Sequence, residues 1–191
     1  MNKKIAVYCS SSDALDGAYY EIARELGESM CRHRYDLVFG GSRVGLMGTL
    51  ARAVHAGGGK VTGVIPEFIR NKGIAYEDSN ELIVTRDMRE RKSVIENLAD
   101  GFIALPGGFG TLDELMEVLT LKQLQIHSKP VILLDVNGLY GRLEFFFEFL
   151  YGHNFAKKDH RDLYFLTESC ETAFEYLEGY KPSTGSEKWF G

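Results

Sequence analysis

Residues 105–114 (LPGGFGTLDE) combine three glycines, a hydroxyl and two carboxylates directly after a short apolar run. Glycines at the start of a helix leave backbone N–H groups exposed, and such groups bind anions through hydrogen bonds and the helix dipole. Thr111 could cap the helix or give a phosphate one more hydroxyl. Because no Gly-Lys-Ser/Thr follows, the loop is not a Walker A loop. The pattern favours the single phosphate of a mononucleotide over ATP hydrolysis.

Glu114 is the carboxylate best placed for chemistry, because it lies one helical turn beyond Thr111 and within reach of a ligand on the loop. A carboxylate beside a sugar phosphate can orient or deprotonate a nucleophile, or stabilise an oxocarbenium-like sugar. Asp113 and Glu117 are instead expected to complement the helix dipole and face water.

A cluster of cations, residues 86–92 (RDMRERK), offers the positive charge that a phosphate and a carboxylate need. Asp87 and Glu90 have the spacing of a capping box, which predicts a helix beginning here. Arg89, Arg91 and Lys92 would then occupy the first turn, where the helix dipole disfavours cations. Cations in that place indicate a ligand, although a basic turn in water is the plainer alternative.

Two further loops follow predicted strands. The serine-rich loop, residues 9–12, could contact a phosphate or sugar through Ser10, or could simply form a turn and helix cap. The glycine-rich loop FGGSRVGLMG carries Gly41 and Ser42 and allows close approach of backbone to a ligand. From Gly41 its spacing is G-x-x-x-G-x-x-G, which is not the dinucleotide fingerprint G-x-G-x-x-G. An NAD-dependent oxidoreductase is therefore disfavoured, and tight helix–strand packing explains some of the glycines.

Short apolar runs alternate with amphipathic helical patterns along the chain, which predicts βαβ units. The expected fold is a Rossmann-like, doubly wound α/β layer with a mostly parallel sheet and helices on both faces, as a single domain over residues 1–180. Ligands bind outside the carboxyl ends of the strands in such folds. Strands are predicted at 5–9, 37–39, 61–65, 82–85, 102–105, 131–134 and 164–166. Helices are predicted at 17–33, 45–56, 88–98, 111–126, 139–151 and 171–177.

Composition narrows the function classes. The chain has 191 residues and a net charge of −5, and binding to nucleic acid usually needs a basic excess. No apolar run reaches the length of a membrane span or of the apolar part of a signal peptide. The three cysteines are widely spaced and have no metal-ligand pattern, which predicts reduced thiols in a cytoplasmic protein. No motif calls for a metal or another cofactor.

Two stretches show no helical or strand pattern. Residues 66–80 form the longest internal loop, for which a surface connection is favoured over a lid. Residues 181–191 are polar and are expected to form a flexible tail.

Taken together, these stretches resemble the LONELY GUY family of cytokinin riboside 5′-monophosphate phosphoribohydrolases, whose members were long described as lysine decarboxylases. Residues 106–114 correspond to the family motif PGGxGTxxE, and residues 88–92 (MRERK) correspond to its MHxRK-like segment. The stretches FGGSRVGLMG and KQLQIHSKPVILLDVNGLY support the match. The resemblance implies a Rossmann-like homodimer with sites near the subunit interface. It also implies hydrolysis of the N-glycosidic bond of a nucleoside 5′-monophosphate to free base and ribose 5-phosphate.

The resemblance also assigns site residues. Arg91 and Glu114 match the catalytic arginine and glutamate of the family. The matching substrate contacts are Lys92, Gly107, Gly108, Phe109, Gly110, Thr111, Leu112, Asp113 and Thr120, to which the other two loops add Ser10, Gly41 and Ser42.

Some positions depart from the family pattern. Arg89 stands where the motif has histidine, and the glycine-rich loop reads Gly40-Gly41-Ser42 where relatives often have a glycine triplet. These departures leave the base open between AMP, a cytokinin nucleotide and other nucleotides. A non-catalytic nucleotide sensor or carrier is the main alternative, because a fold does not fix a function. A lysine decarboxylase fits poorly, since no pyridoxal phosphate lysine motif is evident.

Overall fold

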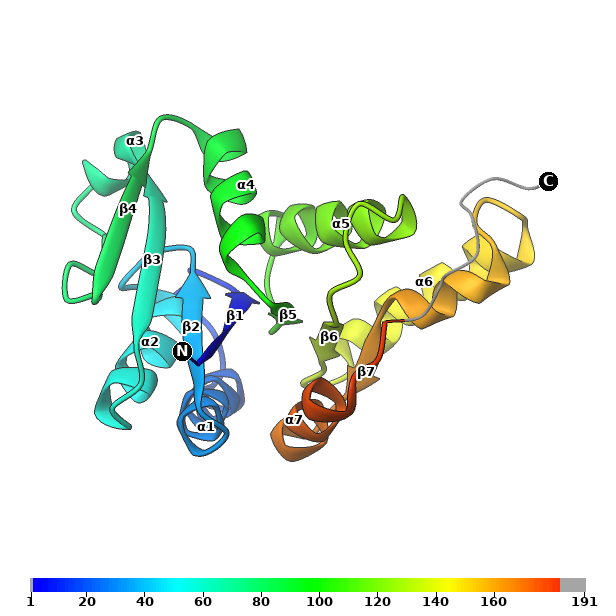
Figure 1. Cartoon of the computed structure of the whole chain (residues 1–191), viewed down its shortest axis with the longest axis horizontal. Helices are drawn as coiled ribbons and strands as arrows, with labels where there is room; N and C mark the ends of the chain where they lie inside the picture. Colours follow the sequence, from blue (N-terminus) through cyan, green and yellow to red (C-terminus); the bar gives the residue numbers. More distant parts are fainter. Residues whose placement is uncertain (1, 183–191) are drawn as a thin grey trace.

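A seven-stranded, all-parallel sheet forms the centre of the molecule in the computed structural model, which describes residues 2–182 (Figure 1). The strand order is β4-β3-β2-β1-β5-β6-β7. This confirms the predicted doubly wound α/β fold. The strands are β1 (Lys3–Tyr8), β2 (Tyr35–Phe39), β3 (Val61–Pro66), β4 (Glu81–Thr85), β5 (Gly101–Ala104), β6 (Val131–Leu134) and β7 (Phe165–Thr167).

Helices connect the strands close to the predicted positions. No helix among the described residues is long and apolar enough to cross a membrane. The 3₁₀ helix before β7 was not predicted, because its polar sequence has no apolar period. The helices are α1 (Gly17–Arg32), α2 (Gly45–Ala56), α3 (Glu67–Arg70), α4 (Met88–Leu98), α5 (Phe109–Gln123), α6 (Leu139–Gly152), η1 (Lys158–Leu163) and α7 (Cys170–Gly179).

The sheet has an apolar core on each face, because successive strand residues point to opposite sides. In β1, Ile5 and Val7 pack with α1, α2 and α7, whereas Ala6 and Tyr8 pack with α4, α5 and α6. Figure 1 shows α1, α2 and α7 on one side of the strands and α4 and α5 on the other. Near-continuous apolar strands are what a parallel sheet covered on both faces requires.

The strand order reverses between β1 and β5, and three loops meet beside this point. The backbone N–H of Ser10, after β1, donates to the carbonyl of Pro106, after β5, over 3.2 Å. The N–H of Leu46, at the start of α2, donates to the carbonyl of Ser10 over 3.0 Å. Ligands of doubly wound sheets bind at such a reversal. The fold therefore brings together the three loops that the sequence singled out.

The connection over residues 66–80 is partly ordered, where an irregular loop was predicted. Its first turn is α3, and residue Ala75 forms an isolated antiparallel bridge with Ser42 of the glycine-rich loop. It is a surface connection fixed to its neighbour, as favoured from sequence. The predicted flexible tail lies outside the described residues from position 183 onward.

Candidate active site

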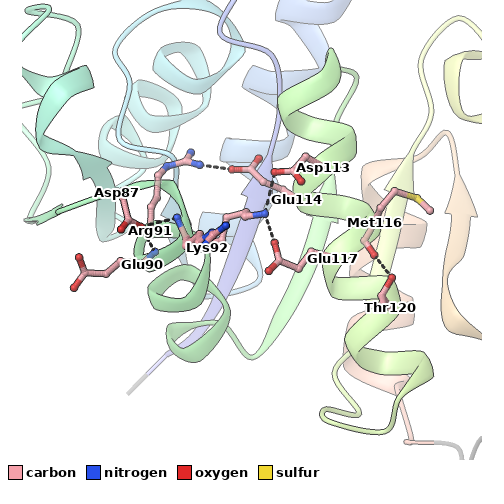
Figure 2. A network of polar contacts seen from close by, with 10 residues as sticks. Asp87, Glu90, Arg91, Lys92, Asp113, Glu114, Met116, Glu117 and Thr120 are labelled. Atoms are coloured by element: carbon pink, nitrogen blue, oxygen red, sulfur yellow. Dashed lines mark hydrogen bonds and ion pairs between the residues drawn. The ribbon is translucent and has the colours of Figure 1, made fainter.

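A buried ion pair between α4 and α5 is the central feature of the site (Figure 2). Nη1 of Arg91 lies 2.5 Å from Oε1 of Glu114, and the two residues are only 5% and 4% exposed. Nε of Arg91 donates to the carbonyl of Val64, within β3, over 3.1 Å. Burying charges is costly even when they are paired. A pair buried at the ligand-binding edge of the sheet is therefore a strong candidate for function.

Local capping explains why Arg91 is the buried cation of its cluster. The Asp87 side chain caps α4 by accepting from the N–H groups of Arg89 and Glu90, each over 2.9 Å. This confirms the predicted helix start. With the start fixed, Arg91 and Ile95 lie one turn apart on the buried face of α4, while Arg89 points to solvent.

The Arg91 guanidinium packs directly against the backbone of Gly40. A Cβ atom at position 40 would lie 2.1 Å from Nη2 of Arg91 and 3.1 Å from Sδ of Met47. Only a residue without a side chain leaves this space. Sequence reasoning treated Gly40 as one glycine of a loop and did not connect it with Arg91.

Lys92 forms a second link between the two helices, beside the buried pair. Its ammonium lies 3.0 Å from Oδ2 of Asp113 and 2.5 Å from Oε2 of Glu117, as Figure 2 shows. The hydrogen bonds to Glu117 and then Asp113 raise the pKa of Lys92 against the effect of its partial burial. Asp113 faces water as expected, with its side chain 59% exposed, but both acids also pair with Lys92, which was not predicted. A substrate phosphate would have to compete with them for this cation.

The first turn of α5 presents an open helix end. Gly108 is the N-cap, and within the described residues no side chain caps this end. The helix begins at Phe109, two residues before the predicted start, so Thr111 is not the cap. The Thr111 hydroxyl instead packs against Gly107. A Cβ atom at position 107 would lie 2.0 Å from Oγ1 of Thr111. Open space surrounds the positions where Gly108 and Gly110 would carry a side chain, so an anion can approach their N–H groups.

Burial shapes the electrostatics around Glu114. It raises the pKa of the Glu114 carboxyl above its ordinary value, while the Arg91 guanidinium opposes that rise. Burial, reinforced by Glu114, also raises the pKa of the Cys9 thiol far above neutrality. Cys9 is therefore an uncharged thiol and not an activated nucleophile. Because water is largely excluded there, a charge on a buried side chain interacts strongly with a charge that develops on a substrate nearby.

Thr120 lies away from this cluster. It is exposed, and its hydroxyl donates to the carbonyl of Met116 on the same helix over 2.7 Å. Nine residues of helix separate it from Thr111, a rise of about 14 Å. Figure 2 shows Thr120 well along α5 from Glu114. Within one chain, the structure does not bring Thr120 to the ion pair.

The other three loop residues occupy different places. Ser10 adjoins the α5 loop, and its Oγ accepts from the N–H of Ser12 over 3.1 Å. Gly41 follows Gly40 in the turn and has a φ of +72°, which favours glycine. Ser42 is buried, and its hydroxyl donates to the carbonyl of Ile74 over 3.3 Å. Ser10 and Gly41 adjoin the cluster, whereas the Ser42 side chain supports the loop itself.

The groups gathered here are of types that can hold a phosphate and act on a sugar. In the part of the chain that the structure describes, no group of three or more His, Cys, Asp or Glu side chains is arranged to hold a metal ion. The helix end supplies N–H donors, and Glu114 and Arg91 supply opposite charges beside it. This set suits stabilisation of a cationic sugar next to an anchored phosphate.

Comparison with known proteins relates the chain to one protein family. A family described as "Possible lysine decarboxylase" matches residues 47–177. The chain is 41% identical over 180 residues to cytokinin riboside 5′-monophosphate phosphoribohydrolase LOG5 of Arabidopsis thaliana, covering 94% of this chain and 79% of that protein. It is 40% identical to the phosphoribohydrolase LOG of Oryza sativa, again over 94% of this chain and 74% of that protein. The molybdenum cofactor carrier protein of Chlamydomonas reinhardtii has a similar structure, with a TM-score of 0.72 over 93% of this chain and 97% of that one. At 22% identity, this last likeness shows the fold alone.

Proposed function

The chain belongs to the family of cytokinin riboside 5′-monophosphate phosphoribohydrolases, and from this premise we propose how its residues carry out the reaction. It is a hydrolase of the N-glycosidic bond of a nucleoside 5′-monophosphate and yields free base and ribose 5-phosphate. The observation that carries the assignment of residues is the buried Arg91–Glu114 pair beside the uncapped end of α5.

The 5′-phosphate is held at the start of α5. No side chain of residues 2–182 caps the N–H groups at this helix start, and the helix dipole favours an anion there. Gly107 allows the tight turn that presents them. With the phosphate fixed, the ribose extends toward Glu114, one turn further along the helix.

Glu114 stabilises the positive charge that develops at the anomeric carbon and accepts a hydrogen bond from the attacking water. The water oxygen bonds to that carbon as the C–N bond breaks, and the bond's electron pair leaves with the base. The water loses one proton and the departing base nitrogen gains one, so the products are neutral base and ribose 5-phosphate. Arg91 pairs with Glu114, opposes the rise that burial gives the pKa of its carboxyl, and has further N–H groups for the nucleotide.

Alanine at position 108 or 110 is expected to weaken substrate binding while leaving the fold intact. Each new methyl group would enter open space in the free protein but would obstruct a phosphate at the helix end. Loss of one charge-assisted hydrogen bond corresponds to a rise in KM of about tenfold or more. Steady-state kinetics with AMP would measure it. Gly17→Ala, also at an open helix start, is the control, and an unchanged KM in both site variants would rule out this phosphate position.

We also propose a homodimer that uses the outer face of α6. The structure divides the phenylalanine-rich sequence EFFFEF, residues 144–149, between the core and the surface. Phe147 is buried, whereas Phe145, Phe146 and Phe149 are 80%, 52% and 51% exposed, and Phe155 beyond the helix is 75% exposed. So large an apolar surface is typical of an interaction site. Thr120, Phe147 and Phe155 line one groove between α5 and α6, so a partner subunit on this face would lie near Thr120.

Sedimentation velocity tests the dimer. The unmodified protein is expected to sediment as a dimer, and Phe146→Glu together with Phe149→Glu as a monomer with unchanged circular dichroism. Glu148→Gln, on the same helix, is the control. A monomeric unmodified protein would contradict the proposal.

The base and the cellular location are the remaining parts of the proposal. We propose that the base is adenine or an N6-substituted adenine, because the similar plant enzymes are named for cytokinin riboside 5′-monophosphates. Turnover of AMP and isopentenyladenosine monophosphate, followed by chromatography of the free base, would rank the two. Free thiols at all three cysteines support a cytoplasmic location.

A further inference from the structure

Backbone hydrogen bonds join the connection between α3 and β4 to the glycine-rich loop. The N–H of Tyr76 donates to the carbonyl of Gly41 over 2.8 Å, and the N–H of Arg43 donates to the carbonyl of Ile74 over 2.8 Å. These bonds flank the antiparallel bridge between Ser42 and Ala75. The Gly40–Gly41 turn is thus held on its outer side by residues 74–76.

The Tyr76 side chain is itself held in place. It is buried, its ring packs edge-on against Phe39, and its hydroxyl lies 2.9 Å from Nδ1 of His55. Nε2 of His55 lies 2.9 Å from Oδ1 of Asn80, an oxygen that also accepts from the N–H of Val61 over 2.7 Å. Because that oxygen can only accept, His55 donates from Nε2, and in the neutral imidazole Nδ1 then accepts the proton of the Tyr76 hydroxyl. The tyrosine is therefore oriented by a complete hydrogen-bond chain.

The inner side of the same turn faces Arg91. The guanidinium lies against the bare backbone of Gly40, and Nε of Arg91 donates to the carbonyl of Val64. Gly41 is also closely packed, since a Cβ at position 41 would lie 2.9 Å from Cβ of Ile65 and 3.3 Å from the backbone of Val64. A shift of the Gly41 carbonyl would therefore also move the backbone of Gly40, against which the Arg91 guanidinium packs.

We propose that Tyr76, oriented by His55, is a positioning residue for Arg91 and sets its guanidinium against Glu114 through the Gly40–Gly41 turn. Neither Tyr76 nor His55 contacts the ion pair, so each acts through the turn. The inference rests on the proposed roles of Arg91 and Glu114 in the hydrolase reaction. The connection between α3 and β4 would then affect catalysis as well as join two elements of the fold.

Tyr76→Phe tests the inference, because it removes one hydroxyl and keeps the ring. We expect kcat per binding-competent site to fall about three- to tenfold, with KM changed by less than about twofold, as for loss of one neutral hydrogen bond. The number of competent sites comes from calorimetric titration with AMP. His55→Ala breaks the same chain from its other end and should give a similar loss. The double variant should be no worse than the more affected single variant, since both act on one chain.

Arg70→Ala is the matched control. Its ion pair with Glu77, at 3.0 Å, belongs to the same connection but has no contact with the glycine turn, so kcat should not change. An unchanged kcat per site in Tyr76→Phe and His55→Ala would overturn the inference, as would a loss that appears only in KM or only in the number of competent sites. Absence of base release by the unmodified protein would instead refute the proposed function on which the inference rests.

Discussion

Replacing Glu114 with glutamine is expected to lower kcat at least about 100-fold, the lower range for a group that acts on the reacting atoms. The dissociation constant for AMP should change by less than about threefold, because the phosphate is bound by backbone N–H groups. Glutamine keeps the shape of the side chain but removes the negative charge that faces the developing cation. Single-turnover kinetics and calorimetric titration would measure the two quantities on the same preparation.

The control for this change must separate chemistry from folding. The amide oxygen of glutamine can still accept from Arg91, although an uncompensated buried guanidinium is expected to lower the melting temperature. Glu117→Gln changes a carboxylate one turn further along α5 that pairs with Lys92 and not with Arg91. It should leave kcat within about threefold. Equal loss of binding and turnover in Glu114→Gln would show that Glu114 is structural.

Alanine at position 40 is the second change with a large expected effect. Its methyl group would coincide with the guanidinium of Arg91, 2.1 Å from Nη2, and would displace it from Glu114. A misplacement of about 1 Å at a reacting centre can cost about 100-fold in rate, and we expect a loss of that order in kcat. The melting temperature should also fall, because overpacking a buried site is destabilising.

Gly17→Ala again serves as the matched control, since open space surrounds that position and it lies outside the site. The Gly40→Ala variant should still bind AMP if it folds, because the helix end of α5 is untouched. Full activity together with an unchanged melting temperature would mean that the Arg91 position is not important for turnover.

Much of the fold follows from local patterns in the sequence. The bounds of α2 and α4 are the predicted ones, because a glycine turn starts the first and the Asp87 cap starts the second. The apolar runs also predicted the parallel sheet, since both faces of each central strand are buried. Both members of the ion pair were assigned by resemblance to a family motif. Their mutual contact depends on how α4 and α5 lie side by side, which neither motif contains.

Other features depend on contacts that a linear pattern does not contain. Gly40 touches Arg91 only because β2, β3 and α4 come together, so its role could not be read from its own loop. Lys92 was expected to contact substrate, and its pairing with Asp113 and Glu117 depends on how α4 crosses α5. Thr120 is exposed on α5, and its role as a substrate contact depends on the proposed dimer.

Product identification in ¹⁸O-labelled water tests the central claim most directly. Purified protein would be incubated with AMP and with isopentenyladenosine monophosphate, and the products would be analysed by mass spectrometry. Cleavage of the N-glycosidic bond by water predicts unlabelled free base and ribose 5-phosphate with one ¹⁸O atom, in equal amounts. Back-exchange at the sugar carbonyl is measured with authentic ribose 5-phosphate. Nucleoside with labelled inorganic phosphate, or bound but uncleaved nucleotide, would contradict the account.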